Sequence, residues 1–234
     1  MKTKITALLL SAALVLSGCQ AIQNASNKAK LGTGIGVGGA AVGAVLGALL
    51  GGNNKGKGAA IGAAVGAVAG TTAGLIIGNK MDKAKKAAEA AQAEAEVYQN
   101  EQGYDYVKVT FPSGLLFGTG QDALTAAAKK DLSTFAQGLT NDMDLYIVGF
   151  SDTQKFKGAT AAQSKVKNQQ LSEKRAASVG NYLAKAGVPQ ARFKSVIGQG
   201  EDSTYPTFEQ NRRVEVYVYP SDDMIRAAEA EASK

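Results

Sequence analysis

Two kinds of hydrophobic pattern divide this chain of 234 residues into an N-terminal and a C-terminal part. Residues 31–52 and 58–78 are uncharged, and within them glycine recurs at every fourth position, from 39 to 51 and from 58 to 78. From about residue 104 onward, short runs of apolar residues either alternate with polar residues or recur at helical spacing. The sequence therefore predicts a globular C-terminal domain after a region rich in small residues.

The C-terminal pattern predicts strand, helix, strand, helix, strand, strand. The apolar run Leu145 to Val148 lies in the most hydrophobic of these strands, which is expected to be central in the sheet. The expected strands are 106–111, 144–150, 192–197 and 214–219, and the expected helices are 122–137 and 171–186. This order predicts an α/β sandwich with the helices on one face of the sheet.

Residues 80–99 are rich in strong helix formers and have no wide apolar stripe. This pattern predicts a solvated helical spacer, which at about 1.5 Å per residue would project the domain by about 30 Å. Residues 221–234 are rich in Ala and Glu and are expected to form a short helical or frayed tail.

The four-residue glycine period places the glycines of each uncharged run along one helix face, where two backbones can approach closely. The two runs are expected to pack as a glycine-zipper hairpin that turns through 52–57. Each run is long enough to cross a hydrocarbon core of about 30 Å. Spanning the bilayer, lying against it, and forming a homo-oligomer through the zipper are all compatible with the pattern.

The N-terminus has the layout of an export signal, with Lys2 and Lys4 before an apolar run. Residues 16–19, LSGC, resemble the bacterial lipobox, in which the cysteine is acylated after the leader is removed. Cys19 would then anchor the chain in lipid. By the same resemblance, Gln20 lacks the inner-membrane retention signal, so the expected location is the periplasmic face of the outer membrane.

The composition restricts the chemistry. The chain has no His and one Cys, which removes Ser/His and Cys/His catalytic pairs and the usual zinc ligand sets. No cofactor or metal is expected. The formal charge of +6 is spread along the chain without a nucleic-acid motif, which argues against nucleic acid as a partner.

Two charged residues stand out in the C-terminal part. Asp152 follows the apolar strand, at the end where open α/β sheets bind ligands. Arg175 shares a largely apolar helix stripe, where a guanidinium needs a partner or a ligand. The spacing alone is equally compatible with a structural Asp152–Arg175 salt bridge and with a binding site.

The segments GFSDT at 149–153, LSEKRA at 171–176 and NRRVE at 211–215 resemble the OmpA-like peptidoglycan-binding domain family over about 104–219. The resemblance implies a mixed βαβαββ sheet, and it implies that Asp152 and Arg175 bind diaminopimelate in the peptidoglycan stem peptide. The carboxylate would receive the ligand ammonium, and the guanidinium would hold a ligand carboxylate. The other residues that match the motif are expected to shape or line the pocket: Thr153, Asn168, Leu171, Asn211, Arg212 and Arg213. Arg212 and Arg213 could equally support the fold.

The sequence departs from the family pattern in three places. The family histidine is replaced by Phe150 and Ser151, residues are inserted between Asp152 and Asn168, and 205–209 replaces the usual loop. The insertion has no acid and contains Lys155, Lys157, Lys165 and Lys167. These lysines are either a solvated loop or a device that attracts the anionic wall.

The expected organisation is a signal peptide at 1–18, a lipidated linker at 19–30, the glycine zipper at 31–79, the helical spacer at 80–103, the OmpA-like domain at 104–220 and a tail at 221–234. The chain is expected to be a non-enzymatic outer membrane lipoprotein that binds peptidoglycan and so tethers the outer membrane to the cell wall. One alternative is a glycine-zipper membrane assembly or pore that the domain localises at the wall. Another is a wall hydrolase, with Glu201 and Asp202 as the nearest candidate acids.

Overall fold

The computed structural model describes residues 71–100 and 102–234. The expected signal peptide, the acylated Cys19 and most of the glycine zipper lie outside these residues. The described part belongs to one compact unit of the chain, which extends from Ala63 to Lys234.

The domain is built on a five-stranded sheet in the order β1-β2-β5-β3-β4. The strands are β1 (Glu94–Gln99), β2 (Asp105–Pro112), β3 (Met143–Ser151), β4 (Phe193–Glu201) and β5 (Arg213–Pro220). β3 and β4 run parallel, and the other neighbours are antiparallel. The predicted βαβαββ order and mixed sheet are confirmed, and β1 adds one further strand at the edge.

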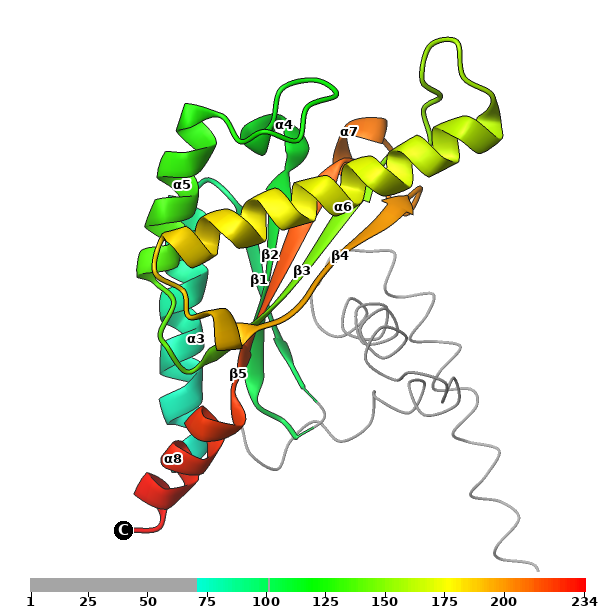
Figure 1. The fold of residues 1–234 in the computed structure, drawn as a ribbon. Coiled ribbons are helices and arrows are strands. Elements are labelled where there is room, and N and C mark those ends of the chain that lie inside the picture. The colour runs from blue at the N-terminus through cyan, green and yellow to red at the C-terminus, as the bar shows by residue number, and fades with distance from the viewer. Residues whose placement is uncertain (1–70, 101) are drawn as a thin grey trace, which may run out of the picture. The chain divides into compact units, whose positions relative to one another are not determined.

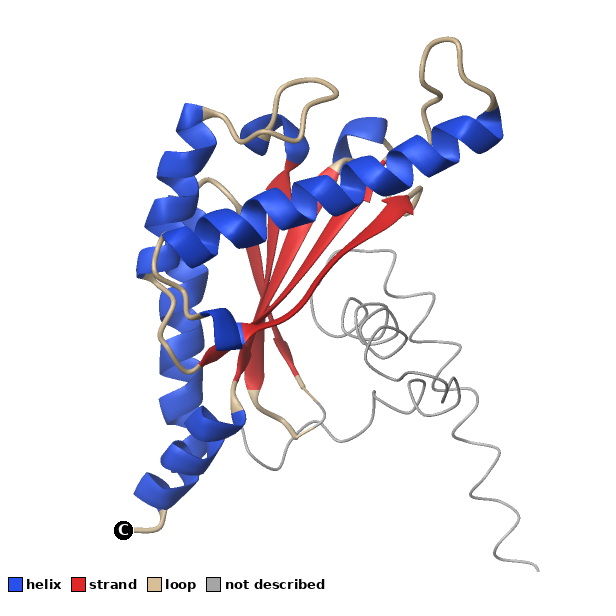
Figure 2. Ribbon diagram, in the orientation of Figure 1, coloured by secondary structure: helices blue, strands red, loops and turns tan. Residues whose placement is uncertain are grey.

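The helices gather to one side of the sheet (Figure 2). The longer helices are α3 (Thr72–Ala90), α5 (Ala126–Gln137), α6 (Ala161–Lys185) and α8 (Asp222–Ala232), and the short ones are α4 (Ser113–Leu116), α7 (Phe208–Asn211) and the 3₁₀ helix η1 (Gln190–Arg192). α6 begins well before the predicted residue 171, because Thr160 and Gln163 form a capping box that starts the helix inside the insertion.

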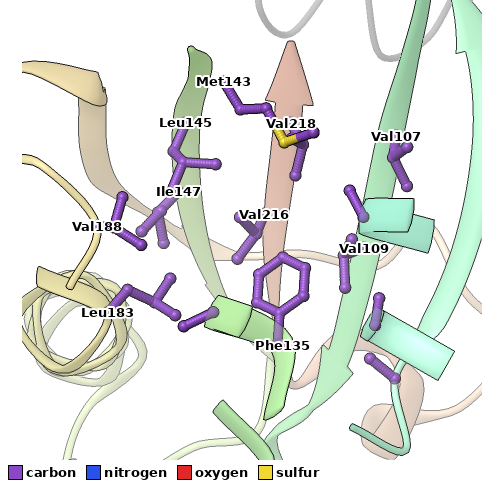
Figure 3. Close-up of a cluster of buried hydrophobic side chains, with 14 of the residues drawn as sticks. Val107, Val109, Phe135, Met143, Leu145, Ile147, Leu183, Val188, Val216 and Val218 are labelled. Atoms are coloured by element: carbon purple, nitrogen blue, oxygen red, sulfur yellow. The ribbon is translucent and has the colours of Figure 1, made fainter. Parts of the chain in front are cut away.

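The hydrophobic core lies between the sheet and these helices (Figure 3). Alternate strand residues such as Val109, Ile147 and Val216 point into it, as the two-residue period of a strand requires. Phe135 of α5 meets Phe111 edge to face, with the ring centroids 5.6 Å apart. The helices therefore cover one face of the sheet, as predicted.

The predicted solvated spacer at 80–103 is wrong. Ile77 and Met81 of α3 are 0% exposed, and Ala84 and Ala88 continue the same buried stripe. Residues 94–99 form β1, which pairs antiparallel with β2. Three of the five buried residues of α3 are alanines, which add little to the hydrophobic pattern, so the helix looks polar in sequence although it closes the core. The predicted projection of about 30 Å does not exist.

The expected boundary at residue 79 is wrong as well, because α3 continues without a break from Thr72, inside the last glycine repeat. The tail at 221–234 is also part of the domain. Its helix α8 buries Met224 and Ala228, and Tyr104 donates a hydrogen bond of 2.7 Å to Glu229. Within the described ranges, no helix has both the length and the apolar character required to cross a bilayer.

Two glycines let α6 lie unusually close to the sheet. A Cβ atom at Gly149 of β3 would lie 2.2 Å from the carbonyl oxygen of Ser172. At Gly198 of β4 it would lie 2.3 Å from the backbone nitrogen of Glu173. Neither contact leaves room for a side chain, so these two strands fix the distance between the sheet and the helix turn that carries Arg175.

Candidate functional site

A cavity of about 500 Å³ lies at the end of the sheet where β3 ends and β5 begins. α4 and α7 are both at this end, and the N-terminal half of α6 runs past it (Figure 1). The lining residues are Ser113, Gly114, Phe117, Gly118, Thr119, Gly120, Ser151, Asp152, Gln154, Lys155, Phe156, Asn168, Leu171, Arg175, Glu209 and Arg212. The fold thus brings the predicted Asp152 and Arg175 to one cavity.

Asp152 comes directly after β3 and is 5% exposed. One carboxylate oxygen accepts a hydrogen bond of 3.0 Å from the backbone nitrogen of Gln154. The other pairs with Nη1 of Arg212 at 2.5 Å. The side chain of Arg212 is 37% exposed, so the pair joins a buried carboxylate to a guanidinium that reaches it from the surface.

Arg175 lies on α6 and is 3% exposed. Its Nε donates to the carbonyl oxygen of Gln121 at 3.0 Å, and its Nη1 donates to Oγ of Ser113 at 3.4 Å. The guanidinium carbon lies 5.2 Å from the centre of the Phe117 ring. Burial, and then the positive charge of Arg212, lower the pKa of Arg175 below its ordinary value.

The structural Asp152–Arg175 salt bridge, which the spacing left open, is not formed. Asp152 pairs with Arg212 instead, and within residues 71–100 and 102–234 no acid forms an ion pair with Arg175. Arg175 is therefore a buried cation whose hydrogen-bond partners are neutral, which is a costly arrangement in the absence of an anion.

The remaining motif residues divide into two groups. Asn168 and Leu171 line the cavity, and Asn168 also donates to Oε1 of Glu201 at 3.0 Å. Thr153 is exposed and does not line it. Asn211 is buried, is not among the residues that line the cavity, and donates to the carbonyl oxygen of Thr207 at 2.8 Å. Asn211 therefore shapes the loop before β5 and does not face the cavity.

Arg212 and Arg213 are adjacent in sequence but have different environments. Arg212 lines the cavity, whereas Arg213 lies between the rings of Phe150 and Tyr205, at 3.9 and 4.7 Å from their centres. Arg213 also pairs with Asp202 at 2.6 Å and with Glu215 at 2.7 Å. Arg213 thus ties the loop to the sheet, and only Arg212 is placed to meet a ligand.

The insertion contributes to the cavity in a way that the sequence did not indicate. Lys155 and Phe156 line it, while Lys165 and Lys167 lie on the extended α6. The segment around α4 was also missed, although it supplies Ser113 and Phe117. Its sequence, PSGLLFGTG, is consistent with a turn and carries no charge that would identify a site.

The two acids considered for hydrolysis have structural partners. Glu201 accepts from Asn168, and Asp202 pairs with Arg213 and accepts from Thr204 at 2.6 Å. Neither acid lines the cavity. Their geometry fits support of the β4–β5 loop.

The Asp202–Arg213 pair makes stability depend on pH. Burial by itself would raise the pKa of Asp202, but hydrogen bonds from Thr204 and Arg213 and the charge of Arg213 lower it below the ordinary value. Stability from this pair is therefore present above the unfolded pKa of about 4, and it is lost as the pH falls through the lower folded value. We expect Asp202→Asn to reduce the free energy of unfolding by about 1–3 kcal/mol at about pH 7 and by less at about pH 3.

Urea unfolding of both proteins at the two pH values measures this difference. The exposed Asp82, replaced by Asn, is the matched control and should change stability little at either pH. An equal loss for Asp202→Asn at both pH values would mean that the charge of Asp202 does not matter.

Comparison with known proteins identifies two regions. Residues 1–82 match the YMGG-like Gly-zipper model, and residues 116–217 match the OmpA family model. A MotB-like protein from Desulfovibrio vulgaris is 21% identical, with a TM-score of 0.48, over 63% of this chain and 94% of that one. The cell wall anchor of the T6SS from Pseudomonas aeruginosa is 23% identical, with a TM-score of 0.47, over 60% of this chain and 97% of that one. The OmpA-like domain of FopA1 from Francisella tularensis is 24% identical, with a TM-score of 0.42, over 55% of this chain and 81% of that one.

Proposed function

We propose that this chain, which combines a YMGG-like Gly-zipper region with an OmpA-family domain of mixed α/β fold, binds peptidoglycan without modifying it. The ligand group is the diamino acid of the stem peptide, diaminopimelate, as the motif resemblance implies. The observation that carries the proposal is the buried guanidinium of Arg175, which has neutral partners and faces the same cavity as the carboxylate of Asp152.

The free end of diaminopimelate carries an ammonium and a carboxylate on one carbon. A carboxylate beside Arg175 would supply the charge that its neutral partners lack, and a planar guanidinium binds carboxylates with two parallel hydrogen bonds. The ammonium would approach Asp152 and compete there with Arg212. Because Arg212 is 37% exposed, its side chain can turn toward water when the ligand takes its place.

These contacts form no covalent bond, so the proposed role is binding and not catalysis. Glu201 and Asp202, the acids considered for hydrolysis, hold the loops beside the cavity. Their hydrogen bonds stabilise the backbone from which Asp152 and Arg212 reach the ligand.

In the cell envelope, the chain would act as a tether. We propose that acylated Cys19 holds it at the periplasmic face of the outer membrane, and that the glycine-rich region lies at that membrane. When many copies of the chain each bind one polymer weakly, the attachment as a whole is strong because the binding is multivalent. Oligomers that persist without residues 71–234 would favour the alternative, a zipper-based membrane assembly that the domain only localises.

Binding of the full chain, in detergent, to isolated peptidoglycan sacculi tests the proposal. We expect the chain to sediment with sacculi, free diaminopimelate to release it, and cadaverine to release much less. Cadaverine is the matched competitor because it keeps two ammonium groups on a chain of similar length but has no carboxylate for Arg175 to bind. No sedimentation, or equal release by both compounds, would contradict the proposed site.

A further inference from the structure

We infer that Lys155 forms a second carboxylate subsite in the cavity, which binds the stem-peptide carboxylate next to the diamino acid. The inference rests on the proposed function and deepens it. If Lys155 binds that carboxylate, the chain distinguishes a stem peptide in which it is free from one in which it is amidated.

The position of Lys155 follows from how the insertion folds. The backbone nitrogen of Phe156 donates to Oγ of Ser164 at 3.1 Å, which holds the loop against the first turn of α6. The nitrogen of Ala159 donates to the carbonyl oxygen of Phe156 at 3.0 Å, and Gly158 with a φ of 74° allows the turn. Lys167 lies over the Phe156 ring at 5.5 Å. The loop is thus fixed at Phe156, and both Phe156 and Lys155 line the cavity.

The charges of the cavity show what the site lacks. Its charged lining residues are Asp152, Lys155, Arg175, Glu209 and Arg212. Asp152 and Arg212 pair with each other. In the part of the chain that the structure describes, no acid forms an ion pair with Lys155 or with Arg175. Lys155 and Arg175 therefore face one cavity as cations without acid partners, and the exposed Glu209 is the lining acid that also forms no ion pair among the described residues. The cations still exceed the acids in the lining, which favours a ligand with two carboxylates.

The cavity also has room for more than one amino acid. Its volume of about 500 Å³ falls within the range of sites that enclose ligands of several hundred daltons. Asp152 and Arg175 account for the free end of the diamino acid. The side of the cavity that Lys155 and Phe156 line is then free for the adjoining part of the stem peptide. The next anionic group along that peptide is the carboxylate of the residue before the diamino acid.

Lys155 differs in this respect from the other lysines of the insertion. Lys155 and Lys157 are both exposed, but Lys155 lines the cavity and Lys157 does not. Lys165 is exposed on α6. A general attraction of the four lysines for the wall would make their effects alike. A subsite predicts that replacing Lys155 weakens binding more than replacing the other lysines does, and only for ligands that carry the free carboxylate.

Calorimetric titration of the full chain in detergent tests this. The ligands are free diaminopimelate, the tripeptide L-alanyl-γ-D-glutamyl-diaminopimelate, and the same tripeptide with the glutamyl α-carboxylate amidated. We expect the wild type to bind the acidic tripeptide about two- to fivefold more tightly than the amidated one, as one exposed charge pair allows. Lys155→Gln should lower the affinity for the acidic tripeptide to that for the amidated one, while Lys157→Gln should keep the wild-type preference.

A wild type without preference for the acidic tripeptide, or a Lys155→Gln protein that keeps the preference, would overturn the subsite. Equal effects of Lys155→Gln and Lys157→Gln would replace it by a general attraction of the loop. If the wild type binds none of the three ligands, the proposed function itself fails. The sacculus experiment reports that failure independently, so the two cases are distinguishable.

Discussion

A chain that begins at Gly103, where a boundary drawn from the sequence would place it, is expected to be largely unfolded, whereas one that begins at Ala63 is expected to fold. The shorter chain lacks α3 and β1. Ile77 and Met81 of α3 are 0% exposed, and loss of one such side chain costs about 2–5 kcal/mol. Loss of both approaches the whole stability of a domain, about 5–15 kcal/mol. The missing β1 also exposes β2 as an unpaired edge.

Thermal unfolding by circular dichroism and the dispersion of backbone amide signals in NMR distinguish the two chains. In the full chain, Ile77→Ala and Met81→Ala should each lower the free energy of unfolding by about 2–5 kcal/mol. Leu75→Ala, on the same helix but 61% exposed, is the matched control and should change it by less than about 0.5 kcal/mol. Equal melting temperatures for both chains would mean that α3 contributes nothing to the fold.

Arg175→Gln is expected to weaken binding to free diaminopimelate and to sacculi by about 10- to 150-fold, with little loss of stability. The ratio corresponds to loss of a charged hydrogen-bonding group, about 1.5–3 kcal/mol. Stability should hold because burial disfavours the charge of Arg175, as its lowered pKa indicates, and because a glutamine amide can still donate hydrogen bonds.

Titration with diaminopimelate and urea unfolding of the same samples measure both effects. Arg226→Gln removes the same charge from an exposed side chain and should leave binding and stability unchanged. A variant of Arg175 that loses several kcal/mol of stability but binds as the wild type would assign this residue a purely structural role.

Strong local signals explain which elements could be predicted. β3 has an uninterrupted apolar run and the acid at its end, and the helix with Arg175 carries an apolar stripe and an NxxLSxxRA pattern, so both were found. α3 was misjudged because Ala84 and Ala88 fill its buried stripe, and alanine contributes little to a hydrophobic period. β1 was missed because its sequence, EAEVYQ, belongs to an exposed edge strand with a weak alternation.

The pairing of charges could not be predicted, because it depends on which face each strand residue occupies. Arg212 and Arg213 are alike in sequence, yet one reaches Asp152 and the other is held between two rings. Those rings belong to Phe150 and Tyr205, which are two of the departures from the family pattern. Both departures therefore place a ring against Arg213, which supports the loop beside the site.

The place where α3 begins determines how the domain would respond to force. In a tether from the membrane to the wall, tension enters the described domain at Thr71 and is resisted at the cavity. It acts first on α3, peeling its buried stripe from Ala73 and Ile77 onward. A helix of 19 residues lengthens by about 35 Å when it is drawn out. Because the same helix closes the core, a pull that detaches it also loosens the sheet that carries the site, so tension on the proposed tether would weaken its hold on the wall.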